Sequence, residues 1–503
     1  MGCCSKIVVA VVLVVLGAVF LIVGCVLGFA VFPNIIQQMV AENVILKEGT
    51  QAWDVWKKLP IPMNFEVYFF NVTNVDEVQM GMKPKLKEVG PYVYKEYKEK
   101  HDIVIDEISG TASYYQNTLF EFDAEASGDL TESDNVTIYN LAIMGLIETV
   151  KIMFPSFTFI DWDKKLPDVK NVFLTDSVKN ILFDGALFLN CTTSPACGLL
   201  NLPQHLPPTI IKDPDENIQF ALFRYKNNTY DGRYEVKLGW SVDGPNPTVD
   251  GVKLIGKIVR WENSTTLTKW SGDCNKLTGT DATIFPPFLT ADSKIDIFST
   301  DLCRSLTALY DKDSSYQGID SLRFTAHEML LADVKTNPDN YCFCPDKRGC
   351  LLKGALDLYA CQGAPAILTF PHFYLAGERY LEMVEGLNPN KELHETFLEI
   401  EPNTGVPLRG GKKVQFNLQM KKYDKFSVSN NLTNALFPIA WINEGVSLDD
   451  ANVNKLKDQL VNNLKIVTGV TWGLIGIGIA MIFAGICLFL LAKCRSGMRS
   501  LKL

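Results

Sequence analysis

The segment Ile466–Ala492, IVTGVTWGLIGIGIAMIFAGICLFLLA, decides how the rest of the chain is arranged. It contains 27 residues and no charge. A helix of that length rises about 40 Å, whereas the hydrocarbon core of a bilayer is about 30 Å thick. Basic residues without an Asp or Glu follow it, at Lys493, Arg495, Arg499 and Lys502. Because positive charge beside a span marks the cytoplasmic side, the sequence predicts a transmembrane helix followed by a cytoplasmic tail.

A second uncharged run, Ile7–Phe32, is 26 residues long and is followed by Pro33. The alternative to a second span is a cleaved signal peptide, whose apolar region is about 7–15 residues long and precedes a small-residue cleavage site. This run is longer, and Val31-Phe32-Pro33 is a poor cleavage site, so a retained span is favoured. The predicted organisation is a cytoplasmic tail at 1–6, spans at 7–32 and 466–492, an ectodomain at 33–465 and a second cytoplasmic tail at 493–503.

Small residues lie on one face of each predicted span. They form Gly24-x-x-x-Gly28 in the first and Gly469-x-x-x-Gly473 in the second. This spacing permits close helix packing within one chain or between chains, so a homo-oligomer is compatible with it.

The ectodomain is long and acidic. It has 433 residues, enough to enclose a cavity. The formal net charge of the chain is −9, and removing the five basic residues of the two tails leaves −14 for the ectodomain. A surface of this charge argues against nucleic acid as a partner and against electrostatic adhesion to anionic lipid.

Eight of the 13 cysteines lie between the spans: Cys191, Cys197, Cys274, Cys303, Cys342, Cys344, Cys350 and Cys361. An even number in an extracytoplasmic domain predicts four disulfides, although spacing alone leaves 105 pairings open. The alternative is a zinc site on Cys342, Cys344 and Cys350. No His or Cys pair with finger-like spacing completes such a site, so we expect no metal and no other cofactor.

Two kinds of modification are consistent with the predicted topology. All six Asn-x-Ser/Thr sequons lie between the spans, at Asn71, Asn135, Asn190, Asn227, Asn263 and Asn431. Cys3, Cys4 and Cys494 lie at the cytoplasmic membrane edge and are candidates for palmitoylation, with free thiols as the alternative.

Strand patterns dominate after an amphipathic helix that follows Pro33. The strands are expected at 65–70, 89–94, 234–238, 252–259 and 414–420. The last alternates strictly, which predicts one buried and one solvated face. Many short strands separated by Gly, Pro and Asn clusters indicate an antiparallel sheet or barrel.

Two stretches, 137–154 and 175–189, have helical patterns, the second with Thr175-Asp176 as its cap. They are either ordinary core helices or a mobile apolar cap over a cavity. Lysines gather in and around them, at Lys164, Lys165, Lys170 and Lys179. These lysines are candidates for receiving an acidic or polar ligand headgroup, and a solvated helix surface is the alternative.

Catalytic patterns are missing from the sequence. The five histidines do not form His-Glu-x-x-His, and there is no Gly-x-Ser-x-Gly elbow. The sequence therefore disfavours an enzyme.

Several distinctive motifs lie in the ectodomain. They are Lys87–Tyr92 (KEVGPY), Asp273–Phe288 (DCNKLTGTDATIFPPF), Asp301–Ser305 (DLCRS), Asn337–Cys344 (NPDNYCFC), Gly386–Asn390 (GLNPN) and Glu399–Pro402 (EIEP). Together they closely resemble the class B scavenger receptors, a family that includes fatty acid translocase and the lysosomal integral membrane protein. Within the family, the chain resembles the insect sensory neuron membrane proteins. They share the run KEVGPY and a cysteine pair like Cys191 and Cys197, which follows a segment like Phe183-Asp-Gly185.

The resemblance implies a mixed α+β fold. The ectodomain would be an irregular antiparallel β-barrel with a helical cap and an internal, largely apolar tunnel, anchored by two transmembrane helices. The implied disulfides are Cys274–Cys342, Cys303–Cys361, Cys344–Cys350 and the branch-specific Cys191–Cys197. The predicted helices at 137–154 and 175–189 would belong to the cap, where ligands of the family meet lysines.

The resemblance also implies a plasma-membrane receptor or transporter, with both termini cytoplasmic. Expected ligands are fatty acids, sterols, carotenoids or lipid-like pheromones, and expected partners are lipid or odorant carrier proteins. One alternative is a two-span ligand-gated channel. The spans of a channel should carry a polar stripe that lines the pore, whereas only Thr468 and Thr471 interrupt the apolar run, near its outer end. Others are a scavenger or adhesion receptor without lipid transfer and, least favoured, an ectoenzyme.

Overall fold

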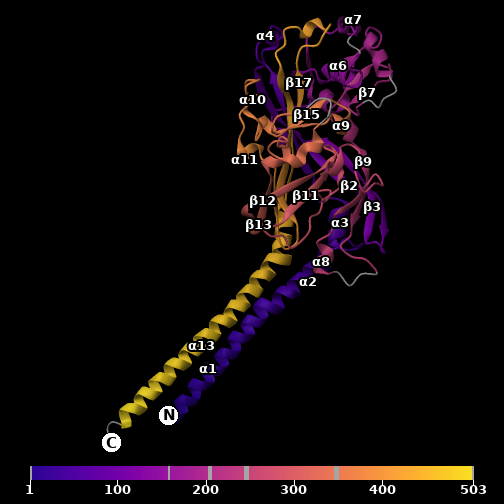
Figure 1. Ribbon diagram of the computed structural model, residues 1–503. Coiled ribbons are helices and arrows are strands. Elements are labelled where there is room, and N and C mark those ends of the chain that lie inside the picture. Colours follow the sequence, from indigo (N-terminus) through magenta and orange to yellow (C-terminus); the bar gives the residue numbers. More distant parts are fainter. Residues whose placement is uncertain (1–2, 157–158, 202–206, 243–247, 345–349, 501–503) are drawn as a thin grey trace.

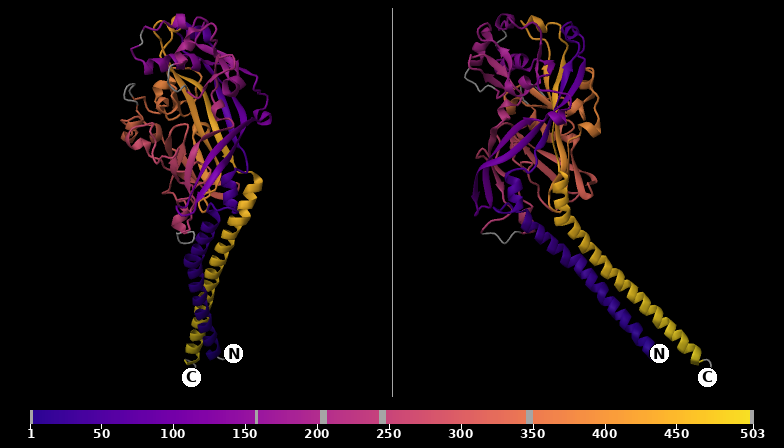
Figure 2. Two further views of the ribbon diagram at one scale, coloured as in Figure 1. Left: turned by 90° about the vertical axis from the view of Figure 1, so that its right-hand side faces the viewer. Right: turned by 180° about the vertical axis from the view of Figure 1, so that it is seen from behind.

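Two long helices project side by side from a body built around one large β-sheet (Figures 1 and 2). The computed structural model describes residues 3–156, 159–201, 207–242, 248–344 and 350–500. The N-terminal helix consists of α1 (Cys3–Val26), the π-helical turn η1 (Leu27–Val31) and α2 (Phe32–Val44). The C-terminal one consists of α12 (Asp450–Leu456), the π-helical turn η10 (Lys457–Val461) and α13 (Asn462–Ser500). Both are long and apolar enough to cross a membrane.

Glycines allow these two helices to approach closely. A Cβ at Gly28 would lie 2.1 Å from the Thr471 side chain, and one at Gly24 would lie 3.0 Å from Ile475. The partner helix contributes Gly478 and Gly485, seven residues apart, whereas Gly469 and Gly473 have open space beside them. The first predicted small-residue pair thus lies in the contact between the helices, and the second faces away from it.

The main sheet is antiparallel and curls into a nearly closed barrel. Its strand order is β10-β9-β3-β2-β1-β18-β17-β16-β13-β12-β11. The gap between the end strands is bridged by Gly279 and Thr280, whose carbonyls accept from the Ile258 N–H (2.8 Å) and the Phe298 N–H (2.9 Å). The expected mixed fold with an antiparallel barrel is confirmed. The strands are β1 (Met63–Val72), β2 (Leu86–Asp106), β3 (Thr111–Phe122), β9 (Thr229–Lys237), β10 (Ile258–Trp261), β11 (Lys294–Ser299), β12 (Arg304–Tyr316), β13 (Ile319–Ala326), β16 (Phe397–Ile400), β17 (Pro407–Met420) and β18 (Ala435–Ser447).

Strand β17 has no solvated face in its second half, contrary to the prediction from its alternation. Here β15 (Ala366–Thr369) pairs with the edge of β17, and β14 (Ala355–Asp357) pairs with β15. Gln415 and Asn417 are fully buried. Gln415 Oε1 accepts from the His372 N–H (2.7 Å), and Asn417 Nδ2 donates to the Ile367 carbonyl (2.9 Å). Hydrogen bonds, rather than water, satisfy these two amides.

A cap covers the barrel end farthest from the long helices (Figure 1). It contains β4 (Asn135–Tyr139), α6 (Leu141–Met153), α7 (Trp162–Lys165), β5 (Phe173–Ser177), η2 (Asn180–Asp184), β6 (Ala186–Leu189), η3 (Pro195–Asn201), β7 (Ile210–Lys212) and β8 (Ile218–Phe220). The helix predicted at 137–154 starts only at Leu141, because 135–139 pairs with β5. The helix predicted at 175–189 is wrong: this stretch is a strand, a π-helical turn and a second strand. Thr175 is not a cap but contacts Thr137 across the β4–β5 pair, and Gly185 has φ +111°, which ends the turn.

The strand predicted at 252–259 is also largely wrong. Val252, the first residue of the predicted strand, is the last residue of α8 (Val249–Val252). The chain then turns at Gly256, which has φ +67°, and β10 begins only at Ile258. The remaining short helices are α3 (Gln51–Lys57), α4 (Val75–Gln79), α5 (Ala124–Ser127), η4 (Arg224–Lys226), η5 (Gly272–Asn275), η6 (Glu328–Leu331), η7 (Pro338–Phe343), α9 (Tyr359–Gln362), η8 (Pro371–Phe373), α10 (Glu378–Leu381), α11 (Lys391–His394) and η9 (Ser427–Ser429).

Candidate functional site: a cavity inside the barrel

The barrel encloses a cavity of about 560 Å³, which lies within the range of about 300–1,000 Å³ typical of small-molecule sites. Its lining is mainly apolar. It includes Met63 at the start of β1 and Val446 near the end of β18. In the chain, Met63 comes after the N-terminal long helix and α3, and Val446 comes shortly before α12. The cavity therefore reaches the barrel end from which the two long helices leave.

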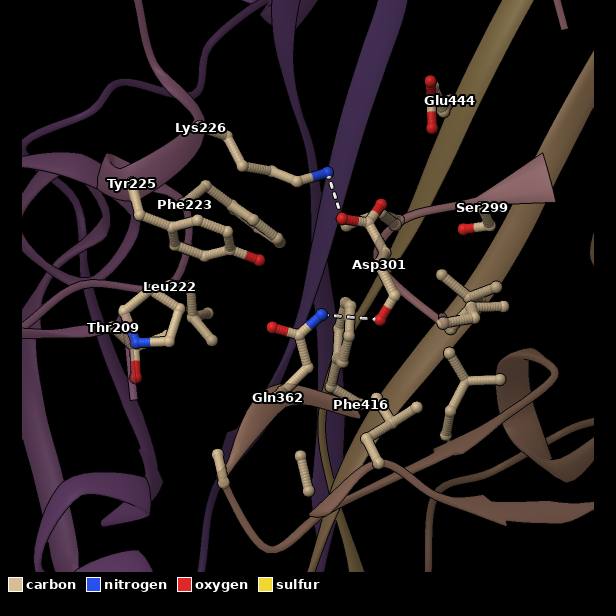
Figure 3. Close-up of a pocket in the computed structure, with 18 of the residues that line it drawn as sticks. Thr209, Leu222, Phe223, Tyr225, Lys226, Ser299, Asp301, Gln362, Phe416 and Glu444 are labelled. Carbon is tan, nitrogen blue, oxygen red and sulfur yellow. Dashed lines mark hydrogen bonds and ion pairs between the residues drawn. The ribbon is translucent and has the colours of Figure 1, made fainter. Parts of the chain in front are cut away.

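A smaller cavity of about 90 Å³ lies on the side of the cap. Its apolar lining includes Phe65, Phe120, Phe223 and Phe416. Five charged residues line both cavities: Glu96, Lys226, Asp301, Lys412 and Glu444. The two cavities therefore share this part of their lining, and Figure 3 shows the Lys226 side chain directed toward Asp301 in the smaller one.

The five residues and Lys98 form a luminal ion network, the name used below for this set of six. Lys226 Nζ lies 2.5 Å from Asp301 Oδ1, and Lys98 Nζ lies 3.2 Å from Glu96 Oε1. Glu444 pairs with both Lys98 and Lys412. The backbone explains part of this arrangement, because Lys412 and Glu444 are direct cross-strand partners on β17 and β18.

Burial and pairing set the protonation of the network. Burial opposes ionisation of Glu444, but Lys412, Lys98 and Lys226 outweigh it and hold its pKa well below the ordinary value. For Glu96, burial and the neighbouring Glu444 dominate and raise the pKa. Burial would lower the pKa of Lys98, yet Glu444 and Glu96 raise it.

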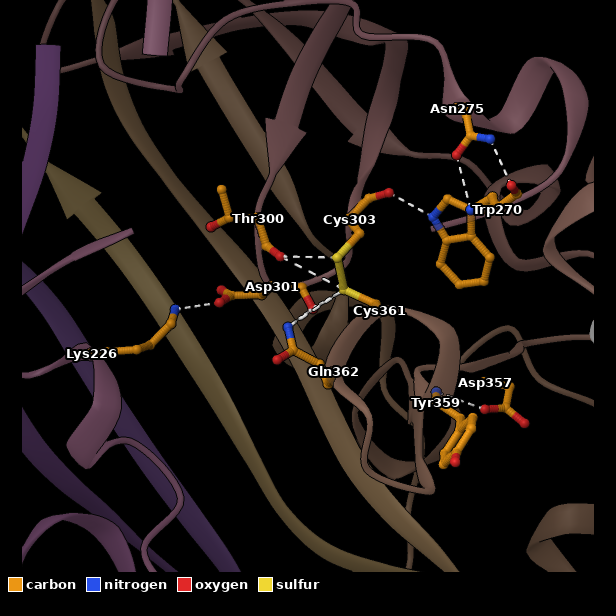
Figure 4. Close-up of a disulfide and its surroundings, with 10 residues drawn as sticks. All are labelled: Lys226, Trp270, Asn275, Thr300, Asp301, Cys303, Asp357, Tyr359, Cys361 and Gln362. Atoms are coloured by element: carbon orange, nitrogen blue, oxygen red, sulfur yellow. Dashed lines mark hydrogen bonds and ion pairs between the residues drawn. A yellow bond between two sulfur atoms is a disulfide. The ribbon is translucent and has the colours of Figure 1, made fainter. Parts of the chain in front are cut away.

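A disulfide holds one member of the network in place. Asp301 lies in the turn between β11 and β12, next to the Cys303–Cys361 bond (Figure 4). Gln362 Nε2 donates to the Asp301 carbonyl (2.8 Å), and Trp270 Nε1 donates to the Cys303 carbonyl (2.6 Å). The backbone of this turn is therefore fixed on both sides of the disulfide.

The other cysteines between the spans also form disulfides. They are Cys191–Cys197, Cys274–Cys342 and Cys344–Cys350. Within the described ranges, no three His, Cys, Asp or Glu side chains are placed to hold a metal ion. The side chains of Cys3, Cys4 and Cys494 lie outside the described part of the structure.

The six sequons all lie on the body. Asn135, Asn190, Asn263 and Asn431 are exposed. Asn71 and Asn227 are half-buried and accept hydrogen bonds from the backbone N–H groups of Thr137 (2.7 Å) and Phe120 (3.0 Å).

The four cap lysines do not surround one cavity. A cap cavity of about 360 Å³ is lined by Lys170, whose Nζ donates to the Pro167 carbonyl (2.8 Å), but not by the other three. Lys164 pairs with Asp161 (2.8 Å) and Lys179 with Asp184 (3.4 Å), while Lys165 is half-buried in α7.

The sequence reading missed the luminal ion network. The signal available was the period of β2, in which Tyr94, Glu96, Lys98 and Lys100 occupy alternate positions and share one face. A large aromatic residue such as Tyr94 marks the inner face of a strand. Charged residues at the next alternate positions therefore indicate charges inside the barrel.

The CD36 family model matches residues 15–489, which is nearly the whole chain. The chain belongs to the CD36 family, the class B scavenger receptors. Among its relatives, sensory neuron membrane protein 2 of Anopheles gambiae is 32% identical, over 95% of this chain and 93% of the relative. Sensory neuron membrane protein 2 of Heliothis virescens is 36% identical, over 88% and 86%. Sensory neuron membrane protein 1 of Apis mellifera is 34% identical, over 94% and 90%.

These comparisons confirm the family and the branch expected from the motifs. The CD36-family chain described here is a membrane protein with two apolar terminal helices and a large, disulfide-bonded body between them.

Proposed function

We propose that this protein is a cell-surface receptor and conduit for hydrophobic ligands such as fatty acids, sterols, carotenoids or lipid-like pheromones. The observation that carries this function is the mainly apolar barrel cavity of about 560 Å³, which reaches the end of the barrel beside the long helices. A sixteen-carbon chain exposes about 15 methylenes, each costing about 0.8 kcal/mol in water, or about 12 kcal/mol in all. An apolar path removes most of this cost between an external carrier protein and the bilayer, and no chemical step is needed.

The proposed topology places both termini in the cytoplasm and residues 33–465 outside the plasma membrane. The basic C-terminal tail and the position of all six sequons on the body support it. In this topology Cys3, Cys4 and Cys494 face the cytoplasmic leaflet and are accessible to palmitoylation. A role in olfaction is supported by the relatives named sensory neuron membrane proteins. An epitope tag at either terminus should therefore be stained only after permeabilisation.

Filling the cavity tests the conduit. Ala308 lines it from β12, so Ala308→Trp should obstruct the lumen. At equal surface delivery, we expect uptake of a fluorescent fatty acid by cells expressing the full-length variant to fall at least fivefold. Ala291→Trp, at an exposed position outside the barrel strands, is the matched control and should transport like the wild type. Undiminished uptake by Ala308→Trp would exclude this cavity as the path.

A further inference from the structure

A small pocket of about 40 Å³ lies outside the barrel cavity, beside the start of β12. It shares Leu330 and Leu331 with the lining of that cavity, and most of its other lining residues are apolar. Its volume suffices for a small ion or a few water molecules. Arg304, the first residue of β12, is the one cation among the described residues that line it.

Arg304 is buried without a counter-ion. The residue is only 6% exposed, and its Nε is enclosed and has no hydrogen-bond partner. No ion pair joins its guanidinium to any residue in the described part of the chain. Because Arg304 lines the pocket, the accessible part of its guanidinium is the part that faces the pocket. Burial lowers its pKa to about 9, so the side chain is still a cation at pH 7.5.

Arg323 shows which partner such a buried guanidinium takes in this chain. Arg304 lies 3.7 Å from the centroid of the Phe343 ring, and Arg323 is stacked on a phenylalanine in the same way, at 3.9 Å. Stacking uses the flat face of a guanidinium and leaves its five N–H groups, which lie in the plane, without acceptors. Those of Arg323 donate to Glu399 and Glu395, both at 3.1 Å. Arg304 has the ring but not the carboxylates, so the partner that it lacks is an anion.

Two carboxylates line the same pocket, but each is held by the backbone. Asp333 Oδ1 accepts from the Thr336 N–H (2.9 Å), and Asp357 Oδ1 accepts from the Tyr359 N–H (2.8 Å; Figure 4). Within the described ranges, neither forms an ion pair with Arg304. Their negative charges share the pocket with a single cation, which disfavours a divalent anion there.

We propose that the pocket beside Arg304 binds one small monovalent anion, a halide or a small carboxylate such as formate. The anion accepts hydrogen bonds from the in-plane N–H groups of Arg304 and neutralises its charge. The apolar part of the lining, which includes Leu330 and Leu356, limits screening of this attraction by water. The site goes beyond the proposed lipid conduit and does not depend on it. It would stabilise the start of β12, three residues from the luminal Asp301.

Replacing gluconate by chloride at constant ionic strength tests the site, because gluconate is too large for the pocket. The thermal midpoint of the full-length protein in detergent is followed at pH 7.5 up to about 0.15 M chloride. We expect it to rise by at least about 2 °C and to saturate, since an anion that binds only the folded state stabilises it by mass action. The same titration with formate distinguishes the two sources of negative charge: the anion that acts at the lower concentration is the preferred class.

One variant locates the effect. Arg304→Met removes the cation and keeps most of the side-chain volume, so it should abolish the chloride-dependent rise. In gluconate it should be at least as stable as the wild type, because it no longer buries an unpaired charge. Arg379→Met, at an exposed position of α10, is the matched control and should retain the wild-type rise. Broadening of the chloride NMR signal by the wild-type protein, reversed by bromide, is a second measurement that needs no variant.

Two results would overturn the site. A rise that Arg304→Met retains is a general effect of the salt. The absence of both the rise and the NMR broadening in the wild type means that the chain supplies the counter-ion itself, for instance from Asp346, which lies outside the described residues. Neither result affects the proposed lipid conduit.

Discussion

Lysines on the cap and lysines inside the barrel have opposite surroundings. The side chain of Lys164 is 83% exposed and pairs with Asp161 three residues away, within the same turn. That of Lys98 is 14% exposed and joins Glu96 on its own strand to Glu444, which lies 346 residues away in the chain. The first pair is screened by water, whereas the second connects distant parts of the barrel in a medium of low dielectric. The lysines that cluster in the sequence are thus expected to contribute less to stability than those inside the barrel.

The strongest test of this contrast removes one lysine from each region. Lys98→Met leaves Glu96 and Glu444 buried with one cation fewer, which should cost about 3–5 kcal/mol. Lys164→Met removes a fully exposed pair and should leave the stability almost unchanged. The thermal midpoints of the full-length proteins in detergent should therefore separate by several degrees. Equal midpoints would mean that the luminal charges are solvated like those of the cap.

The same contrast applies to two disulfides. Cys303–Cys361 closes a loop with a sequence separation of 58 beside the luminal Asp301, and Cys191–Cys197 closes one of 6 in the cap. Loop-closure entropy predicts losses of about 4 and about 2 kcal/mol when each pair is changed to serine. The barrel double mutant should also show lower surface delivery, measured by flow cytometry with an extracellular antibody. A larger loss from the cap pair would contradict this order.

The sequence was informative where one physical signal dominates a long segment. Two uncharged runs predicted the long helices, and the β-branched and aromatic residues at 65–70 predicted β1. The motifs fixed the family, and the family implied the barrel. These features depend on local composition or on specific residue strings.

Prediction failed where distant segments decide the local structure. Val178, Ile181 and Leu182, which would share one face of the helix predicted at 175–189, are buried, but pairing of β5 with β4 makes the preceding residues a strand. The alternation of β17 predicts a solvated face for Gln415 and Asn417, but β15 pairs beside them and their amides bond to the backbone of His372 and Ile367. The luminal ion network combines residues from five separate stretches of chain, and no local pattern brings Asp301 to Lys226.

A buried histidine outside the lumen gives a pH-dependent test. His394 is 3% exposed, its ring stacks on that of His372 at 4.3 Å, and its Nδ1 accepts from the Asn390 N–H (3.0 Å). Burial, followed by His372 and Lys413, lowers its pKa to about 4, although Glu88 acts in the opposite direction. Between pH 6.5 and pH 4, His394 therefore binds a proton less readily in the folded state than in the unfolded state.

Acidification through that window should remove up to about 3 kcal/mol of stability. The buried Asp231, whose pKa is raised to about 6, opposes this trend between about pH 4 and 6, so the comparison must be with a variant that retains it. His394→Asn should flatten the fall of the thermal midpoint from pH 7.5 to pH 5. His327→Asn, at an exposed histidine, should retain the wild-type slope. Parallel slopes for all three proteins would show that His394 titrates normally.

The smallest effect is expected from the cap lysines themselves. Changing Lys164, Lys165, Lys170 and Lys179 together to Gln should lower uptake of a fluorescent fatty acid about twofold at equal surface delivery, because water and salt screen the attraction of exposed lysines for an ionised headgroup. Lys170→Gln alone should account for most of this loss, since Lys170 is the member that lines the described cap cavity. An uncharged ester of the same acid should be taken up normally by both variants, which separates charge from packing. If the quadruple mutant transports the acid like the wild type, these lysines only interact with solvent on the cap surface, and the ligand headgroup is selected inside the barrel.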